Sequence, residues 1–465
     1  MRNKLFGSRE FYHRVLAISV PIMVQNAITN FVSLLDNVMI GRVGTVEMSG
    51  VAIANQLLFV FNMLVFGAIA GAGIFGAQFF GNRDMDGVRH TLRFKLMICL
   101  VLAAACIGIF TAFGPQLINL YLKGEGAVED AEASLRYGLQ YIKVMYIGML
   151  PYAITQAYAG TLRETGETLL PMKAGIVAVL VNLTFNYILI FGHFGAPRMG
   201  VVGAAIATVL SRFVELAIVV SWAHRHAVRF PYITGLYRSL HIPSRLFRDI
   251  LRRGTPLLVN EGLWAAGMAM LNQCYSLRSL DVVAATNISS TIWNLFACVY
   301  LALGSAISIM VGQELGAGDF EKAKVTARQT TAFSVAISIG VGLLMAFVGT
   351  YFPLIYRTTD TVRHLATNFI RIGACLMPFT AMTNALYFTL RAGGKTMVTF
   401  LFDSAFVWLI NIPVAYVLSR YTAMPILLLY ACCQSLEIIK CIIGTVMVKK
   451  GIWINNIVAD KKGEV

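Results

Sequence analysis

The sequence predicts an all-α membrane protein in which twelve transmembrane helices form two six-helix bundles, related by a pseudo-twofold repeat. Three observations predict this fold class. Hydrophobic residues make up 57% of the chain and charged residues only 13%, whereas a soluble domain would carry about 25% charge. Apolar runs that reach the roughly 20 residues needed by a membrane-spanning helix recur along the whole chain. The second half of the chain also repeats motifs of the first half at similar spacing.

The predicted spans follow one another with short connections. Their ranges are 15–40, 51–80, 95–121, 136–160, 170–192, 200–222, 256–278, 284–312, 331–355, 366–389, 397–419 and 425–448. Because the number of spans is even, both termini lie on the same side of the membrane. Most Lys and Arg residues lie in the termini and in alternate connections, so the positive-inside rule predicts a plasma (cell inner) membrane protein with both termini cytoplasmic.

The longest connection separates two lobes. We predict an N-terminal lobe over 1–222, a cytoplasmic linker over 223–253 and a C-terminal lobe over 254–465. The linker ends in SRLFRDILRRG, where basic and apolar residues alternate as in a short amphipathic helix at a membrane surface. Its apolar residues, Leu246 and Ile250 among them, are expected to face lipid.

The two halves share several motifs. Pro21 in SVPIMVQ corresponds to Pro256 in GTPLLVN, and GAQFFGNRDMDGVRHT corresponds to VGQELGAGDFEKAKVT at the same offset. Further on, LRETGET corresponds to LRAGGKT, which pairs Arg163 with Arg391. Six spans in each repeat leave both halves in the same orientation, so the pseudo-twofold axis is expected to run along the membrane normal. Asp84 and Asp319 are expected to cap the helices that follow the GNRD and GAGD turns.

The first span carries polar groups on one side. At 100° per residue, its polar residues fall within an arc of about 140°. They are Gln25, Asn26, Thr29, Asn30, Ser33, Asp36 and Asn37. A carboxylate in hydrocarbon costs at least ~2.5 kcal/mol, so Asp36 is expected to face protein or water. We therefore interpret Asp36 as an ion site and Gln25, Thr29, Asn30 and Ser33 as candidates for lining a substrate cavity.

Spans 5 and 6 offer partners for this carboxylate. Asn182 and Asn186 lie one turn apart in VNLTFNYI, and Thr208 in span 6 can add a hydroxyl. Carboxylate and amide oxygens suit a hard monovalent cation such as Na+, or a network that accepts a proton. The alternative interpretation is that these asparagines only join helices by hydrogen bonds.

The second half distributes its charges differently. The position that corresponds to Asp36 is Leu271, whereas Glu261 lies early in span 7 and shares a face with Asn272. We interpret both as cavity candidates, although Glu261 can equally be a shallow acid near the cytoplasmic surface. Two further acids, Glu215 and Glu437, stand three residues from Arg212 and Lys440, and such pairs can neutralise themselves. Asp403 is expected near the cytoplasmic interface.

Other functional classes find little support. The net charge of +15 follows the connections and forms no aromatic-interleaved basic face, so no nucleic-acid partner is expected. The eight cysteines lie in apolar segments without a CxxC pair. Catalytic and nucleotide-binding motifs such as HExxH and the P-loop are absent from the sequence. We expect no enzyme activity and no cofactor, and no metal site beyond Na+ at Asp36, Asn182 and Asn186. Energy would come from an ion gradient, in a functional monomer.

The LLDNVMIGRVG stretch around Asp36, the GAQFFGNRD and GQELGAGD pair and the repeated halves resemble the multidrug and toxic compound extrusion (MATE) family. This resemblance implies a cation-coupled antiporter that exchanges H+ or Na+ for organic, often cationic, drugs by alternating access. The family's acid in the first helix maps onto Asp36, and its polar pair in span 5 maps onto Asn182 and Asn186. Some members have an acid at the second of these positions, where this chain has Asn186. The NorM-like branch also has an acid in span 10, where Asn384 is the nearest polar candidate here.

Three alternatives remain open from the sequence. The first is a flippase for lipids or lipid-linked oligosaccharides from the same wider superfamily, which would favour basic residues in its cavity. The second is a membrane-embedded enzyme, which would need a convergent catalytic set. The third is a receptor or scaffold without transport activity.

Overall fold

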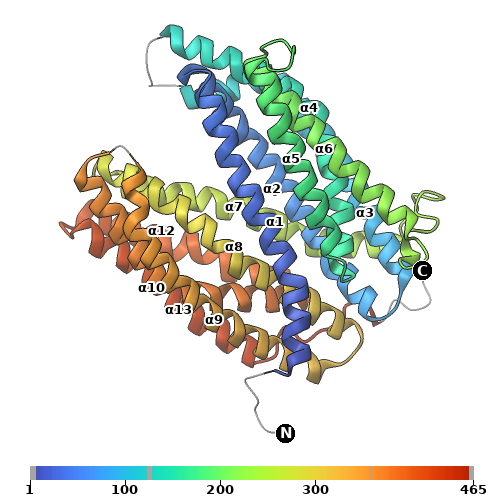
Figure 1. Ribbon diagram of the computed structural model, residues 1–465. Coiled ribbons are helices and arrows are strands. Elements are labelled where there is room, and N and C mark those ends of the chain that lie inside the picture. Colours follow the sequence, from blue (N-terminus) through green and yellow to red (C-terminus); the bar gives the residue numbers. More distant parts are fainter. Residues whose placement is uncertain (1–6, 123–127, 357, 460–465) are drawn as a thin grey trace. The chain divides into compact units, whose positions relative to one another are not determined.

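The computed structural model describes residues 7–122, 128–356 and 358–459. In this part of the chain, twelve long helical segments follow one another (Figure 1). The first ten segments are each a single helix, the eleventh is composed of several helical pieces, and the twelfth is the single helix α13. The ten are α1 (Arg9–Gly41), α2 (Thr45–Gly81), α3 (Met85–Leu122), α4 (Val128–Glu164), α5 (Leu169–Phe191), α6 (Gly200–Arg225), α7 (Ser244–Ser276), α8 (Leu280–Gly316), α9 (Phe320–Tyr351) and α10 (Asp360–Ala392).

The composite segment contains two π-helical turns. It runs through α11 (Thr396–Phe400), η3 (Leu401–Ala405), η4 (Val407–Asn411) and α12 (Ile412–Tyr421), and α13 (Ile426–Lys449) follows it. A π turn widens the helix by one residue and is common at functional sites. Two short 3-10 turns, η1 (Pro231–Ile233) and η2 (Phe352–Ile355), lie in connections.

The twelve segments confirm the predicted membrane fold. Among the described residues, ten are long and apolar enough to cross a bilayer. The remaining two, α4 and α7, contain more polar and charged residues along their length. The predicted short helix that starts at Ser244 is the first part of α7, which continues without a break to Ser276. Leu246 and Ile250 are buried in protein, contrary to the expectation that the apolar residues of this segment face lipid, whereas Phe247 and Leu251, of which the same was expected, are exposed.

The chain forms two compact units. The first unit contains residues 1–23, 77–84 and 251–464, and the second contains 24–76 and 85–250. Helix α1 therefore contributes its beginning to one unit and its remainder to the other, with the division just after Pro21. The last turn of α2 likewise belongs to the first unit.

In the second unit, α6 packs against both α4 and α5, and α4 packs against α3. Two arginines near the start of α3 bind the linker that follows α6. Arg89 donates to the carbonyls of Pro231 and Tyr232, and Arg93 donates to those of Gly235 and Leu236. The linker is thus held against the end of the bundle through its backbone.

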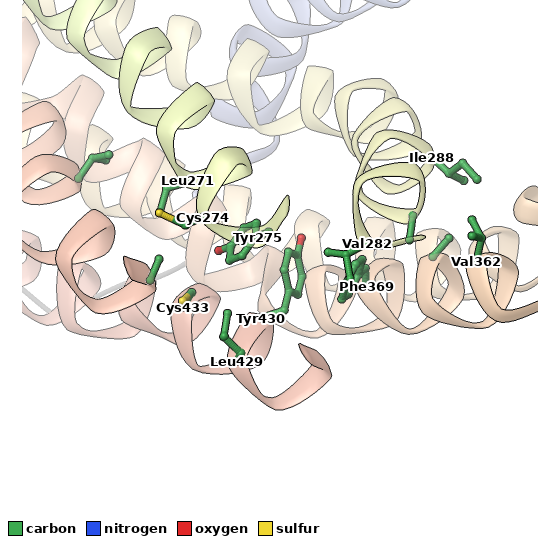
Figure 2. Close-up of a cluster of buried hydrophobic side chains, with 14 residues drawn as sticks. Leu271, Cys274, Tyr275, Val282, Ile288, Val362, Phe369, Leu429, Tyr430 and Cys433 are labelled. Atoms are coloured by element: carbon green, nitrogen blue, oxygen red, sulfur yellow. The ribbon is translucent and has the colours of Figure 1, made fainter. Parts of the chain in front are cut away.

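In the first unit, α10 packs against α8, α9 and α13. Apolar side chains from α7, α8, α10, the composite segment and α13 meet in one cluster (Figure 2). Tyr430 lies at its centre, with ring centroids 4.4 Å from Phe369 and 5.5 Å from Tyr275. These three buried rings join α7, α10 and α13, which come from different parts of the second half.

The two repeats have the same turns at corresponding places. Arg83 has φ 57° and its counterpart Gly318 has φ 79°, so both occupy the left-handed region. Asp319 caps α9 by accepting a hydrogen bond from the backbone of Lys322 at 3.1 Å, as predicted. Gly166 and Gly394, which the LRETGET and LRAGGKT motifs pair, both have positive φ as well.

The last turns of α2 and α8 cross in direct backbone contact. A Cβ atom at Gly81 would lie 1.9 Å from the carbonyl oxygen of Gln313, and one at Gly316 would lie 1.9 Å from that of Gln78. Only glycine permits such an approach at both positions. The glycines of the repeated motif therefore serve close packing of helix on helix.

Candidate functional site

Asp36 lies near the end of α1 in the second unit, and its side chain is half-buried. Its carboxylate accepts a hydrogen bond from Nδ2 of Asn186 at 2.6 Å. In the part of the chain that the structure describes, no ion pair to Asp36 is found. The charge of this carboxylate is therefore met by a neutral amide and not by a cation.

The amides of α5 extend the contact away from Asp36. Asn182 and Asn186 stand one helical turn apart on the buried face of α5. Nδ2 of Asn186 also donates to Oδ1 of Asn182 at 3.1 Å, and Nδ2 of Asn182 donates to Oγ1 of Thr208 in α6 at 3.2 Å. Thr208 in turn donates to the carbonyl oxygen of Ala204 at 3.0 Å. The structure thus brings the four predicted residues into one continuous chain of hydrogen bonds.

A buried tyrosine of α4 lies beside these hydrogen-bonded residues. The buried Tyr141 contributes its hydroxyl, which interacts with Thr208 and with Asn55 of α2. Tyr141 also lies close enough to Asp36 to be affected by its charge. We did not identify Tyr141 from the sequence, because nothing in its local pattern distinguishes it from a core tyrosine.

One polar atom of the site has no partner. Oδ1 of Asn186 is buried and accepts no hydrogen bond from the described residues. A buried carbonyl oxygen without a donor is costly unless something positive reaches it. Carboxylate and amide oxygens are the type of ligand that suits a proton or a hard monovalent cation. In this structure Asn186 turns its Nδ2, and not its Oδ1, toward Asp36 and Asn182.

The remaining candidates of the first span lie apart from this chain. Oε1 of Gln25 accepts a hydrogen bond from Nη2 of Arg163 at 2.7 Å. Thr29 and Asn30 are exposed, and Thr29 donates back to the carbonyl oxygen of Gln25 at 2.9 Å. The side chain of Ser33 lies outside the described part of the structure.

The candidates of the first unit do not form one site. Glu261 is half-buried near Arg391 and Asp403, whereas Asn272 is exposed. Asn384 has a buried Oδ1 without a hydrogen-bond partner among the described residues, and this atom packs against Gly304. Within the described residues, no hydrogen bond or ion pair joins these three.

Two predicted pairings need correction. Lys440 does not pair mainly with Glu437: its Nζ lies 2.7 Å from Oδ1 of Asp403, on a different helix. The side chain of Asp403 is 17% exposed. Glu215 lies near both Arg163 of α4 and Arg212 of its own helix, so Arg212 is not its only cationic neighbour among the described residues.

The most important residues that the sequence analysis passed over are two arginines. Arg163 interacts with Gln25 and Glu215 in the second unit, and Arg391 interacts with Glu261 in the first. The signal was present, because the repeated LRETGET and LRAGGKT motifs pair these positions. We used that match only as evidence of a repeat.

Twelve helical segments with repeated turns define a helical membrane protein of two related halves. The family model MatE matches residues 21–188 and again residues 257–417, which together make up more than half of the chain. The chain therefore belongs to the MATE family of transporters, as its motifs predicted, and it is a multi-pass membrane protein. The two separate matches also agree with the repeat.

Relatives match over most of their length. The Probable multidrug resistance protein NorM of Thermotoga maritima is 24% identical over 420 residues, covering 90% of this chain and 88% of that protein. The protein of the same name from Bacillus anthracis is 25% identical over 410 residues, covering 86% and 87%.

Solved structures show the same fold. A mutant of the Vibrio cholerae MATE transporter VcmN aligns with a TM-score of 0.84 and 17% identity, covering 96% of this chain and 98% of that one. A Pyrococcus furiosus transporter of the MOP superfamily, described as having a binding pocket of reverse polarity, aligns with a TM-score of 0.81 and 19% identity, covering 96% and 97%.

Proposed function

We propose that this protein exports organic, often cationic, drugs in exchange for H+ or Na+ by alternating access. The observation that carries the proposal is the chain of hydrogen bonds from Asp36 through Asn186 and Asn182 to Thr208. An intramembrane carboxylate without a cationic partner is costly unless it binds a cation in part of its cycle. The relatives named as probable multidrug resistance proteins support the choice of substrate class.

The coupling step follows from the charge of Asp36. When the carboxylate is ionised, it favours an organic cation over a neutral solute. Binding of H+ or Na+ removes that attraction and changes the contacts of Asn186, so that drug and driving cation compete. A cation that binds one state better than the other shifts the equilibrium by the difference in its affinities. Pro21 lies between Asp36 and the beginning of α1 and is the place where we expect the helix to repack.

The site holds one carboxylate and two amides, and this sets its charge. Because Asn186 is neutral, Asp36 alone neutralises the driving cation. We propose that this site takes up one monovalent cation in each cycle. We expect the protein to function as a monomer. We also expect it to lie in the plasma membrane with both termini in the cytoplasm.

Proteoliposomes test the proposed function directly. Purified full-length protein would be reconstituted, and uptake or release of ethidium would be followed by fluorescence under an imposed pH gradient, an Na+ gradient, or neither. We expect transport to be driven by at least one of the two gradients. Equal ethidium flux in all three conditions would contradict the proposal.

A flippase remains the second candidate, and one observation favours it. Arg163 and Arg212 lie within the helices of the second unit and share Glu215 as an acidic neighbour. Buried guanidinium groups suit the phosphate of a lipid-linked substrate. Inhibition of ethidium transport by organic cations, and not by short-chain lipid phosphates, would favour the exporter; the opposite order of inhibition would favour the flippase.

A further inference from the structure

The linker that follows α6 encloses a hollow of about 470 Å³ in the second unit. Sites for small molecules usually have volumes of about 300–1,000 Å³, so this hollow is large enough for one. The polar side chains in its wall are those of His224, Thr234, Tyr237 and Arg238. Within the described structure, no acidic side chain lines it. The hollow therefore has the composition of a site for an anion.

Two of these side chains are free to bind a ligand. Arg238 and Thr234 are both exposed, and in the part of the chain that the structure describes neither side chain has a hydrogen bond or an ion pair. A guanidinium group donates to two oxygens at once, and a hydroxyl adds a third donor. Phosphate is the anion whose oxygens such a set of donors fits best.

The opposite wall is held in place by Tyr158 of α4, which is almost completely buried. Its hydroxyl shares a hydrogen bond with Nε2 of His224 at 3.1 Å and another with the hydroxyl of Tyr237. The rings of His224 and Tyr237 are stacked, with centroids 5.7 Å apart. This wall is thus arranged before any ligand arrives, and Nδ1 of His224 remains available.

The acceptors around the hollow already have partners. The carbonyl oxygens of Gly235 and Leu236 accept hydrogen bonds from Arg93 of α3 at 2.9 Å each. Glu167, an acid beside the linker, lies 3.5 Å from a guanidinium nitrogen of Arg229. Neither the loop carbonyls nor this carboxylate is free to repel a phosphate group or to bind an ammonium group.

The hollow lies at the depth of the lipid headgroups. Helix α6 has 26 residues and ends with His224 and Arg225 in its last turn. A helix of this length measures about 39 Å, whereas the hydrocarbon core of a bilayer measures about 30 Å. Because α6 is apolar enough to span a membrane, its last turn emerges among the headgroups, and His224 carries the hollow to that level.

The surface around the hollow suits an anionic lipid in two respects. The linker contains seven arginines and one acid, Asp249, and each basic residue near a membrane surface attracts anionic lipid by about 1 kcal/mol. Val228, Tyr237 and Leu240 are exposed, and Val228 is 97% exposed. Apolar and aromatic side chains beside basic ones are typical of protein surfaces that lie in the membrane interface.

We propose that this hollow binds the headgroup of an anionic phospholipid. Arg238 and Thr234 donate to the phosphate oxygens, and Val228 and Tyr237 lie against the acyl chains. A headgroup that carries an ammonium group binds less well, because no free carboxylate is there to receive it. The proposal goes beyond the proposed export of drugs and does not depend on it, since binding needs no gradient and no substrate.

Native mass spectrometry tests the site on the purified full-length protein in a neutral detergent. Phosphatidylglycerol or phosphatidylcholine with the same acyl chains would be titrated, and the affinity for the first bound lipid measured. We expect phosphatidylglycerol to bind more tightly. Arg238→Gln should weaken its binding about tenfold, because a hydrogen bond to a charged group is lost. Thr234→Val changes no charge and should weaken it about threefold.

The matched control is Arg248→Gln, which removes the same charge from an exposed arginine of the linker outside the hollow. We expect this variant to keep wild-type affinity, because a neutral detergent presents no charged surface. Equal affinity for the two lipids, or equal losses in Arg238→Gln and Arg248→Gln, would overturn the proposal. Displacement of phosphatidylglycerol by glycerol 1-phosphate would overturn it too, because the occupant would then be a soluble phosphate ester.

Discussion

At the scale of single residues, Asp36 differs from the paired acids of the helices in how its charge is met. Glu164 and Asp403 each bind a lysine, whereas Asp36 is bound by the amide of Asn186. A carboxylate neutralised by a fixed cation is unavailable to a mobile one. The absence of an ion pair to Asp36 in the described structure is therefore the reason to assign the coupling role to this acid.

Replacement of Asn186 shows whether Na+ or H+ is the driving cation. Asn186→Ala removes a hydrogen bond to a charged group, which contributes about 1.5–3 kcal/mol, so the cation requirement should change by about tenfold to a hundredfold. For Na+ the concentration at half-maximal export should rise, because an amide ligand is lost. For H+ it should fall, because the ionised carboxylate loses its donor.

Ethidium transport at varied Na+ and pH measures this change. Thr184→Ala is the matched control, because Thr184 is exposed on the same helix and donates only to the carbonyl oxygen of Leu180. If Asn186→Ala requires the same Na+ concentration and the same pH as wild type, α5 takes no part in cation coupling.

Arg83 is a non-glycine residue whose backbone adopts the left-handed conformation that favours glycine. It is exposed and has φ 57°, where its counterpart in the second repeat is a glycine. A left-handed conformation costs an L-residue roughly 1–2 kcal/mol, and a glycine avoids most of this. We expect Arg83→Gly to increase the free energy of unfolding by about 0.5–1 kcal/mol, measured as a higher thermal unfolding midpoint in detergent. Asn82→Gly, at a neighbouring position with negative φ, should lower it.

At the scale of elements, the crossing of α2 and α8 depends on two glycines. A methyl group at Gly81 or Gly316 would meet a backbone carbonyl oxygen at 1.9 Å, and a backbone atom cannot move aside as a side chain can. We expect Gly81→Ala and Gly316→Ala each to lower stability by about 1–3 kcal/mol, measured as the thermal unfolding midpoint. Gly340→Ala is the control, because nothing lies near that position in α9. Equal midpoints for Gly81→Ala and wild type would contradict the close crossing.

The same crossing holds the C-terminal segment. The buried side chain of Gln78 donates to the carbonyls of Ala392 and Asn455, at 3.0 Å and 3.2 Å, and accepts from the backbone of Ile457 at 2.9 Å. Gln313, its counterpart in the second repeat, accepts a hydrogen bond from the exposed Arg14. The two repeats thus use equivalent glutamines for different attachments.

These glutamines provide a matched pair of variants. Gln78→Met leaves three buried backbone groups without partners, at about 1–3 kcal/mol each. We expect it to make the segment that contains Trp453 and Ile457 sensitive to limited proteolysis. Gln313→Met should leave that segment protected. Equal protection in both variants would show that Gln78 does not hold the segment.

At the scale of the whole molecule, much of the fold was predictable. Apolar length and repeated motifs predicted the helices and the repeat, because a bilayer fixes helix length and turns need particular residues. The sequence also predicted the contact among Asp36, Asn182, Asn186 and Thr208, since polar groups in a membrane must find one another.

Other features depended on contacts between distant segments. The pair of Asp403 and Lys440 joins different helices, and the nearer Glu437 was the more obvious partner from spacing alone. The continuity of α7 was missed because basic residues at its start resemble those of a surface helix. The π turns around Asp403 have no local signal that separates them from ordinary helix.

The central claim is that a cation bound at Asp36 drives export, and gradient-driven ethidium transport by Asp36→Asn in proteoliposomes tests it most directly. Asparagine keeps the shape of the side chain and removes its charge. We predict that flux falls to the level of liposomes without protein, while Asp86→Asn, at an exposed acid of the same unit, keeps wild-type flux. Full gradient-driven export by Asp36→Asn would contradict the claim.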